Sequence, residues 1–193
     1  MAKTRLFLAG DLPGGWVKSF RTAVPVLRGM TTRMSPAKTG NEHLTWVILG
    51  ELDERQVAAA EQTLSAAFAS LRSEHGFSAD SMDVTFDRWT AQVRGREGYL
   101  VRADLIPGEA HRFAVQQISN ALAASGIPLP QRSWLAHVTL ARRVRLKDGL
   151  GADAVRGLPQ PLDGRTVSLE RVTLYESAFT PNGMHYSERM SWK

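Results

Sequence analysis

Two short stretches decide the fold of this chain: HLTWVILG at residues 43–50 and AHVTLAR at residues 136–142. Each is an apolar run typical of a buried strand, and each contains the pattern His-x-Thr. Because side chains alternate along a strand, His43 and Thr45 point to the same face, about 6.6 Å apart. His137 and Thr139 repeat this arrangement later in the chain. The sequence therefore predicts two strands that each present one imidazole and one hydroxyl.

The segments around these stretches carry strand and helix patterns in turn. Apolar residues at helical spacing predict helices over residues 16–24, 54–75 and 113–122. Strands are expected at residues 5–10, 43–50, 82–86, 98–105, 133–142, 166–175 and 185–192. Each half contains a long helix and a His-x-Thr strand, so we expect two similar lobes that face each other across a shared cleft.

Punctuating residues define the ends of these elements. Asp53 and Gln56 form a candidate capping box for the second helix, and Gly76 is expected to end it. Pro25 is expected to end the first helix. Residues 29–40, which are rich in Thr, Met, Pro and Gly, are interpreted as a loop.

Length and composition favour one globular domain over residues 1–193. Apolar residues make up 43% of the chain and charged residues 22%, which is sufficient for a core. The net charge of +5 favours an anionic partner, although such an excess is also common in proteins that never bind nucleic acid. The absence of cysteine excludes disulfides, thiolate metal ligands and a cysteine nucleophile. Neither a signal peptide nor a membrane-spanning run is present, so we expect a cytoplasmic protein without membrane contact.

The paired His-x-Thr patterns suggest chemistry at phosphorus. Imidazole exchanges a proton near neutral pH, and a hydroxyl can donate to a phosphate oxygen. Two such pairs on opposite sides of a phosphorus suit an in-line displacement, in which one histidine takes a proton from water and the other protonates the leaving oxygen. A single histidine in an apolar strand is more often simply hydrogen-bonded in place. The functional interpretation therefore depends on the pair.

The chain resembles the two-histidine phosphoesterase superfamily, and within it the bacterial and archaeal RNA 2′,3′-cyclic phosphodiesterases, also named 2′-5′ RNA ligases. The resemblance is carried by RLFLAGDLP at 5–13, NEHLTW at 41–46, AHVTLAR at 136–142 and LYES at 174–177. It implies an α+β, bilobal fold in which two pseudo-symmetric lobes with antiparallel sheets surround a central cleft. Ala136 departs from the family, which usually has proline there, and Gly10 replaces an aliphatic residue.

The same resemblance implies roles for five residues. His43 and His137 would be the catalytic proton-transfer pair, with His43 as the acid and His137 as the base. Thr45 and Thr139 would donate to the phosphate oxygens. Arg142 would stabilise the charge that builds on those oxygens, for which a guanidinium fork is suited.

Other residues near the motifs have competing interpretations. Strand alternation places Arg143, not Arg142, on the face of the second motif, so the role of Arg142 requires a bend in the strand. Phe7 could stack on the terminal base, although core packing is its ordinary role. Tyr186 is a candidate for the cleft wall. His111 lies early in a helix and is expected to be solvated.

The implied activity is hydrolysis of an RNA-terminal 2′,3′-cyclic phosphate to a 2′-phosphomonoester. No cofactor is expected, and no metal site, because the sequence has neither H-E-x-x-H nor a carboxylate cluster. The expected partner is RNA with a cyclic phosphate end or a small cyclic nucleotide, bound by a monomer. Two alternatives stay open: reversible 2′-5′ ligation on the same site, and a non-catalytic module that binds RNA ends.

Overall fold

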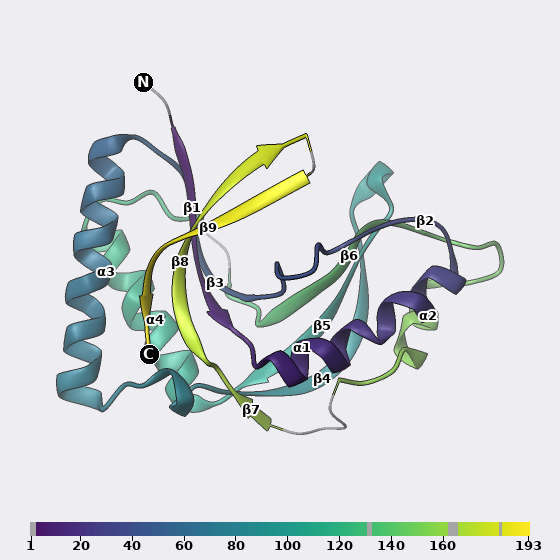
Figure 1. Cartoon of the computed structure of the whole chain (residues 1–193), viewed down its shortest axis with the longest axis horizontal. Helices are drawn as coiled ribbons and strands as arrows, with labels where there is room; N and C mark the ends of the chain where they lie inside the picture. Colours follow the sequence, from purple (N-terminus) through teal and green to yellow (C-terminus); the bar gives the residue numbers. More distant parts are fainter. Residues whose placement is uncertain (1–2, 131–132, 162–165, 182) are drawn as a thin grey trace.

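Two antiparallel sheets form the two lobes of the molecule (Figure 1). The computed structural model describes residues 3–130, 133–161, 166–181 and 183–193. One sheet has the order β3-β1-β8-β9 and the other the order β2-β6-β5-β4-β7. Their strands are β1 (Thr4–Asp11), β2 (Thr31–Pro36), β3 (Leu44–Leu52), β4 (Asp83–Val93), β5 (Tyr99–Pro107), β6 (His137–Leu146), β7 (Thr166–Ser168), β8 (Arg171–Thr180) and β9 (Gly183–Trp192). The predicted α+β bilobal class is confirmed.

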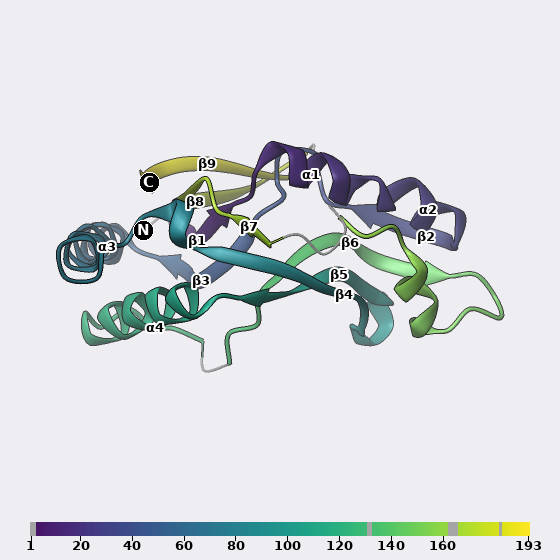
Figure 2. The same ribbon diagram turned by 90° about the horizontal axis from the view of Figure 1, so that it is seen from below.

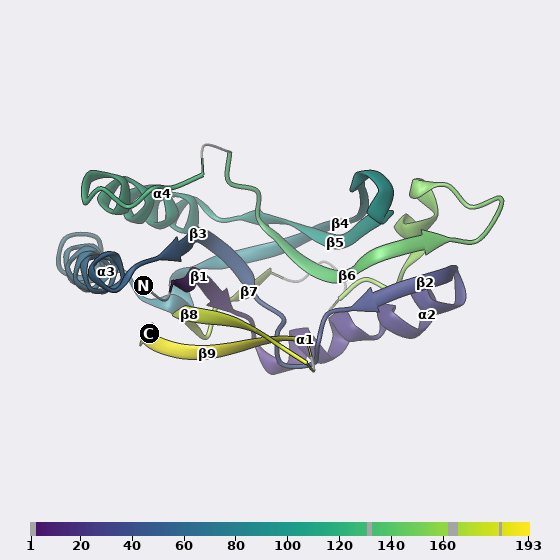
Figure 3. The ribbon, with the colours of Figure 1, turned by 90° about the horizontal axis from the view of Figure 1, so that it is seen from above.

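Helices cover the outer faces of the two sheets. They are α1 (Gly14–Arg21), α2 (Ala23–Gly29), α3 (Glu54–His75) and α4 (Glu109–Ala124). Helices α3 and α4 lie side by side at one end of the molecule, whereas α1 and α2 run along the five-stranded sheet (Figure 2, Figure 3). Buried apolar residues from both lobes join into one hydrophobic cluster. No helix in the described part of the chain combines the length and apolarity needed to cross a membrane.

Aromatic contacts anchor each helical layer to its sheet. Phe68 of α3 stacks on Trp192 of β9, with ring centroids 4.2 Å apart. Phe20 of α1 lies 5.3 Å from Trp89 of β4. Large buried rings carry most of the apolar area in a core, so these contacts fix the helices against the sheets.

The predicted ends of α3 are confirmed. The Asp53 side chain accepts a hydrogen bond from the Gln56 amide, and the Gln56 side chain accepts one from the Asp53 amide, which completes the capping box. At the other end, Gly76 adopts the left-handed conformation with φ of 61°. Local hydrogen bonding therefore sets both ends of this helix, which explains why the sequence predicted them.

The structure corrects two predictions in the first lobe. Pro25 does not end the helical segment, since it lies in the first turn of α2, where the missing amide hydrogen has no intrahelical partner to lose. Residues 29–40, predicted to be a loop, contain strand β2, which pairs with β6. Strand β2 is an edge strand with one buried residue, Thr31, so it lacks the apolar alternation by which strands are recognised.

His111 was expected to be solvated, and that prediction is wrong. Its side chain is fully buried in α4, with ring centroids 5.0 Å from Trp46 and 5.4 Å from Trp134. Its Nδ1 lies 3.3 Å from the carbonyl oxygen of Asp83, and its Nε2 is buried without a hydrogen-bond partner among the described residues. Burial lowers the pKa of His111 to about 4. The ring is therefore held neutral inside the core.

This burial predicts a loss of stability in mild acid that His111→Phe should reduce. The pKa of the ring is about 4 in the folded state and 6.5 in the unfolded state, so below pH 6.5 the unfolded chain binds the extra proton. The free energy of unfolding should fall between pH 6.5 and 4, with a contribution of about 3 kcal/mol from this residue. In urea titrations, His111→Phe should flatten this pH dependence.

The substitution is sterically and chemically mild. The Asp83 carbonyl also accepts from the Gly108 amide at 2.9 Å, so a phenyl ring in place of the imidazole leaves no unsatisfied carbonyl. His75→Gln, at the exposed end of α3, is the control and should keep the wild-type pH dependence. Identical pH profiles for wild type and His111→Phe would contradict the buried, neutral ring.

Candidate active site

Each His-x-Thr motif is carried by a strand, and the two strands belong to different sheets. His43 immediately precedes β3, and His137 begins β6. Around the first motif Leu44 and Trp46 are buried, whereas His43 and Thr45 are partly exposed. The second motif repeats this alternation. The predicted common face of each histidine and its threonine is confirmed.

The two motif segments also touch each other. Strands β3 and β6 are in contact. The Trp134 indole, just before the second motif, donates a 2.9 Å hydrogen bond to the carbonyl oxygen of Thr45 in the first. This bond joins the two lobes next to both motifs, so it restrains the separation of the two histidines.

The two imidazoles are held by the same local hydrogen bond. Nδ1 of His43 lies 2.8 Å from the carbonyl oxygen of Asn41, and Nδ1 of His137 lies 2.8 Å from that of Leu135. A carbonyl only accepts, so each Nδ1 carries the hydrogen when the ring is neutral. Nε2 is then the nitrogen that can take up or release a proton in the cleft.

The loop before His43 is fixed from two sides. Glu42 is buried, accepts from the Gly40 amide at 2.8 Å and forms an ion pair with Arg21 of α1. The Asn41 side chain donates to the carbonyl oxygen of Met184 in β9 at 3.2 Å. These contacts hold the Asn41 carbonyl, and through it the His43 ring, in place.

Burial dominates the electrostatics of both histidines. It lowers the pKa of His43 from 6.5 to about 4, and the negative charge of Asp11 opposes this effect. Burial also lowers the pKa of His137. The positive charge of Arg142 adds to the lowering at both rings, and that of His137 adds to it at His43. The structure thus brings the two histidines and Arg142 within electrostatic reach of one another.

The bend that Arg142 requires is present in β6. Pairing with β5 advances from Tyr99 opposite Val144 to Val101 opposite Ala141, so β6 contains an extra residue between these pairs. Within this bulge Arg143 has φ of 52°, the left-handed region that non-glycine residues rarely adopt. A bulge reverses the face that the following side chains occupy, which resolves the conflict between strand alternation and the expected position of Arg142.

An aromatic cluster forms one wall beside His43. The ring of Phe7 lies 4.9 Å from His43, 5.3 Å from Tyr175 and 4.9 Å from Tyr186, measured between centroids. Phe7 is only 7% exposed, so in this structure its contacts are with the protein, as its core interpretation predicted. Tyr186 lies beside the first motif, where the sequence made it a candidate.

Sequence reasoning missed Asp11 as a hub at the end of β1. Its carboxylate accepts from Arg171 Nε at 2.7 Å, from the Thr173 hydroxyl at 2.9 Å and from the Tyr175 hydroxyl at 2.7 Å. Burial and the contact with Asp11 raise the pKa of Tyr175 to about 12. Asp11 lies within the RLFLAGDLP stretch, but its partners follow some 160 residues later in the chain, so no local signal could identify them.

Arg102 and Asp104 on β5 were also missed. They lie opposite Thr139 and His137 in the pairing of β5 with β6, so their side chains share the face of the second motif. Both are 8% exposed, and Arg102 Nε donates to Asp104 Oδ1 at 2.7 Å. The positive charge of Arg102 lowers the pKa of His137, and the negative charge of Asp104 opposes it. Among the described residues, no group of three His, Asp or Glu side chains could hold a metal ion.

The bulge predicts that Arg142 and Arg143 differ in function. Arg142→Lys should weaken the binding of inorganic phosphate by about tenfold, because lysine keeps the charge but loses the planar fork. Arg143→Lys, one residue away and equally exposed, is the matched control and should bind phosphate like the wild type. Calorimetric titration measures both. If Arg143→Lys is the damaging change, the assignment is wrong by one residue.

Comparison with known proteins identifies the fold. No protein-family model and no curated protein matches the chain. Among solved structures, Escherichia coli LigT complexed with 3′-AMP shares 20% identity, with a TM-score of 0.68 over 98% of this chain and 97% of that one. A crystal structure described as a phosphoesterase gives 22%, 0.68, 98% and 97%, and TT0787 of Thermus thermophilus gives 21%, 0.67, 97% and 96%. The chain therefore has the bilobal fold of the LigT-like two-histidine phosphoesterase superfamily.

Proposed function

We propose that this protein hydrolyses the 2′,3′-cyclic phosphate at an RNA end to a 2′-phosphate by acid–base catalysis. One observation carries the proposal: two imidazoles from different lobes are each held through Nδ1, which leaves Nε2 available for proton transfer. Two such groups, one on either side of a phosphorus atom, provide the base and the acid of an in-line displacement.

The reaction then needs no group beyond those of the chain. His137 Nε2 takes a proton from the attacking water as its oxygen bonds to phosphorus. The bond from phosphorus to O3′ breaks, and His43 Nε2 gives a proton to O3′. The products are a 2′-phosphate and a 3′-hydroxyl. Thr45 and Thr139 are proposed to donate to the phosphate oxygens, and Arg142 to offset their charge.

The charges around the two rings support this division of roles. An acid must hold a proton, and Asp11 favours the protonated form of His43. A base must be free of its proton, and Arg102 favours the neutral form of His137, although Asp104 opposes it. The two rings are therefore not equivalent, even though their sequence motifs are.

Similar proteins and overall charge support the proposed substrate class. LigT has been crystallised with 3′-AMP, ATP and NADP+, which are all nucleotides. The net charge of +5 favours an anionic ligand. RNA with a cyclic phosphate end, or a small cyclic nucleotide, satisfies both. Because one chain supplies both histidines, we propose a monomer, and an RNA substrate is consistent with a cytoplasmic location.

Reversible 2′-5′ ligation is the second candidate, because the same two groups would catalyse the reverse step with a 5′-hydroxyl or 3′-hydroxyl nucleophile in place of water. A module that only binds RNA ends is less well supported. Binding alone would not require two imidazoles that are buried, lowered in pKa and oriented by identical hydrogen bonds.

A single assay tests the reaction, its product and its metal requirement. A short RNA ending in a 2′,3′-cyclic phosphate should be hydrolysed in the presence of EDTA, with the 2′-phosphate as the dominant isomer by chromatography. A DNA strand with a 3′-phosphate is the control and should be unchanged, because DNA lacks the 2′ oxygen. A 3′-phosphate product, or loss of activity on chelation, would contradict the proposal.

Replacement of either histidine tests the proposed roles. His43→Ala and His137→Ala should each lower kcat by about two to four orders of magnitude, the usual range for a positioned acid or base. The double variant should cost far less than the product of the two effects, because the residues act as a unit. His185→Ala, at a histidine that belongs to neither motif, is the control. Near-wild-type turnover in either single variant would exclude this mechanism.

A further inference from the structure

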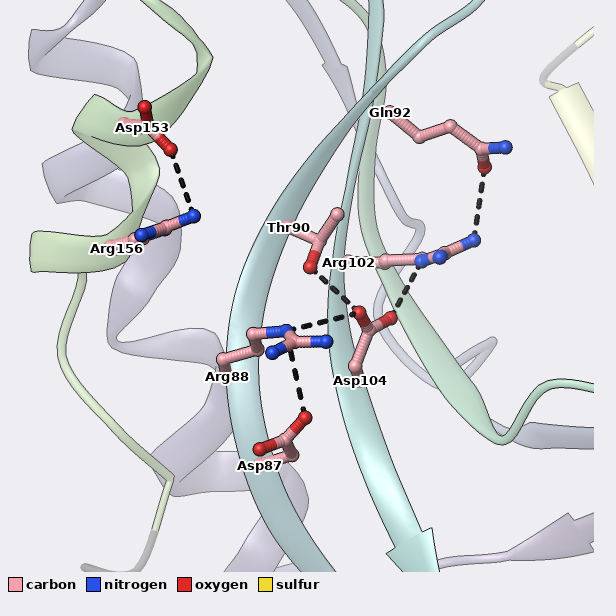
Figure 4. A network of polar contacts seen from close by, with 8 residues as sticks. All are labelled: Asp87, Arg88, Thr90, Gln92, Arg102, Asp104, Asp153 and Arg156. Carbon is pink, nitrogen blue, oxygen red and sulfur yellow. Dashed lines mark hydrogen bonds and ion pairs between the residues drawn. The ribbon is translucent and has the colours of Figure 1, made fainter.

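A second polar cavity lies beside the second His-x-Thr motif. It has a volume of about 510 Å³ and is formed by β4, β5 and the short helix η3 (Ala152–Gly157). Its polar lining consists of Arg88, Thr90, Arg102, Asp104, Asp153 and Arg156 (Figure 4). Cavities of this size accept groups as large as a nucleotide.

The strand register connects this cavity to the candidate active site. Arg102 lies opposite Thr139 of β6 on one side and opposite Thr90 of β4 on the other. Residues opposite each other on neighbouring strands share a face, so these three side chains form a row across the sheet. With strands about 4.8 Å apart, the row extends about 10 Å from the motif. A ligand held at Thr139 can therefore reach the cavity without leaving this face.

The hydrogen bonds inside the cavity occupy its acceptors first. Asp104 accepts from Arg102 through Oδ1 at 2.7 Å and from Thr90 through Oδ2 at 2.7 Å, and it is 4.0 Å from Arg88 Nε (Figure 4). Asp153 Oδ1 pairs with Arg156 Nη2 at 3.0 Å. The carboxylate between the strands is thus already saturated by donors.

The arginines, by contrast, keep donors in reserve. A guanidinium has five N–H groups. Among the described residues Arg102 uses Nε for Asp104 and Nη1 for the Gln92 side chain, at 2.7 and 2.9 Å. Arg88 and Arg156 are 64% and 70% exposed at their side chains and make ion pairs through one nitrogen each. The cavity is therefore balanced in charge but rich in free donors, which suits a ligand rich in acceptors.

We propose that this cavity binds a second phosphate of the substrate, attached on the 5′ side of the nucleotide that carries the cyclic phosphate. This inference rests on the proposed function. A 2′,3′-cyclic phosphate ends the chain, so any further phosphate must lie in the 5′ direction. Phosphate offers only acceptors, and arginine forks bind it with directional, charge-assisted hydrogen bonds.

Rigidity favours Arg102 as the residue that links the two sites. It is buried, and its two bonds to Asp104 and Gln92 come from β5 and β4, so its planar head is fixed before a ligand arrives. A guanidinium that is already ordered loses little entropy on binding. The exposed ion pairs of Arg88 and Arg156 contribute little to stability, so these two arms can turn toward a phosphate at small cost.

The test compares equilibrium binding of three reaction products by calorimetry: adenosine 2′-monophosphate, adenosine 2′,5′-bisphosphate and the dinucleotide ApAp with a terminal 2′-phosphate. The bisphosphate, the dinucleotide or both should bind about tenfold more tightly than the monophosphate. Gain with both ligands identifies any 5′ phosphate as the recognised group, and gain with the dinucleotide alone identifies an internucleotide diester. Equal affinity for all three overturns the subsite.

Variants locate the effect in the cavity. The double variant Arg88→Gln, Arg156→Gln should reduce the tenfold preference to less than about threefold. Arg55→Gln, at an exposed position of α3, makes the same kind of charge change elsewhere and should keep the preference. Thermal unfolding checks that the variants fold, and the wild-type comparison decides the matter if they do not. Because binding is measured without turnover, failure of the subsite and failure of the proposed hydrolysis are distinguishable.

Discussion

The candidate site depends on one hydrogen bond that occurs twice, from the Nδ1 of a histidine to the carbonyl oxygen two residues before it. The bond fixes the ring relative to its own backbone, so the position of each imidazole is set by its strand and the segment just before it. It also decides which nitrogen faces the cleft. Everything else in the structure then has one task, which is to hold two strand ends from different sheets at a fixed separation.

Several contacts between the lobes perform this task. The indole of Trp134 bonds to the backbone of the first motif, and its ring packs against the buried ring of His111. On the other side of His111 lies Trp46, which belongs to the first motif strand. An imidazole without a partner for its Nε2 is an unusual core residue, and its place between these two tryptophans makes it part of the joint between the lobes.

The two halves of the site are alike in backbone and different in charge. Asp11, held by Arg171, Thr173 and Tyr175, is the nearest negative influence on His43. Arg102, on the strand next to the second motif, is the leading positive influence on His137. A pair of equal groups cannot act as acid and base at once, so this asymmetry would allow a pseudo-symmetric fold to catalyse a directional proton transfer.

The sequence by itself determined the two motif strands, the alternation that pairs each histidine with its threonine, and the ends of α3. These features depend on interactions within a few residues, which strand period and capping chemistry describe. It could not determine strand β2, whose only support is pairing with β6, or the burial of His111, which requires tryptophans from two other segments.

Only the tertiary structure decided where the charges of the site lie. The bulge in β6 that separates Arg142 from Arg143 arises from pairing with neighbouring strands, and strand alternation alone placed the wrong arginine on the cleft face. Asp11 gains its partners from β8, and Arg102 meets Thr139 only through the register of β5 and β6. Contacts between residues distant in the chain leave no periodic or local signal in the sequence, because they depend on register and packing, which are properties of the assembled sheets.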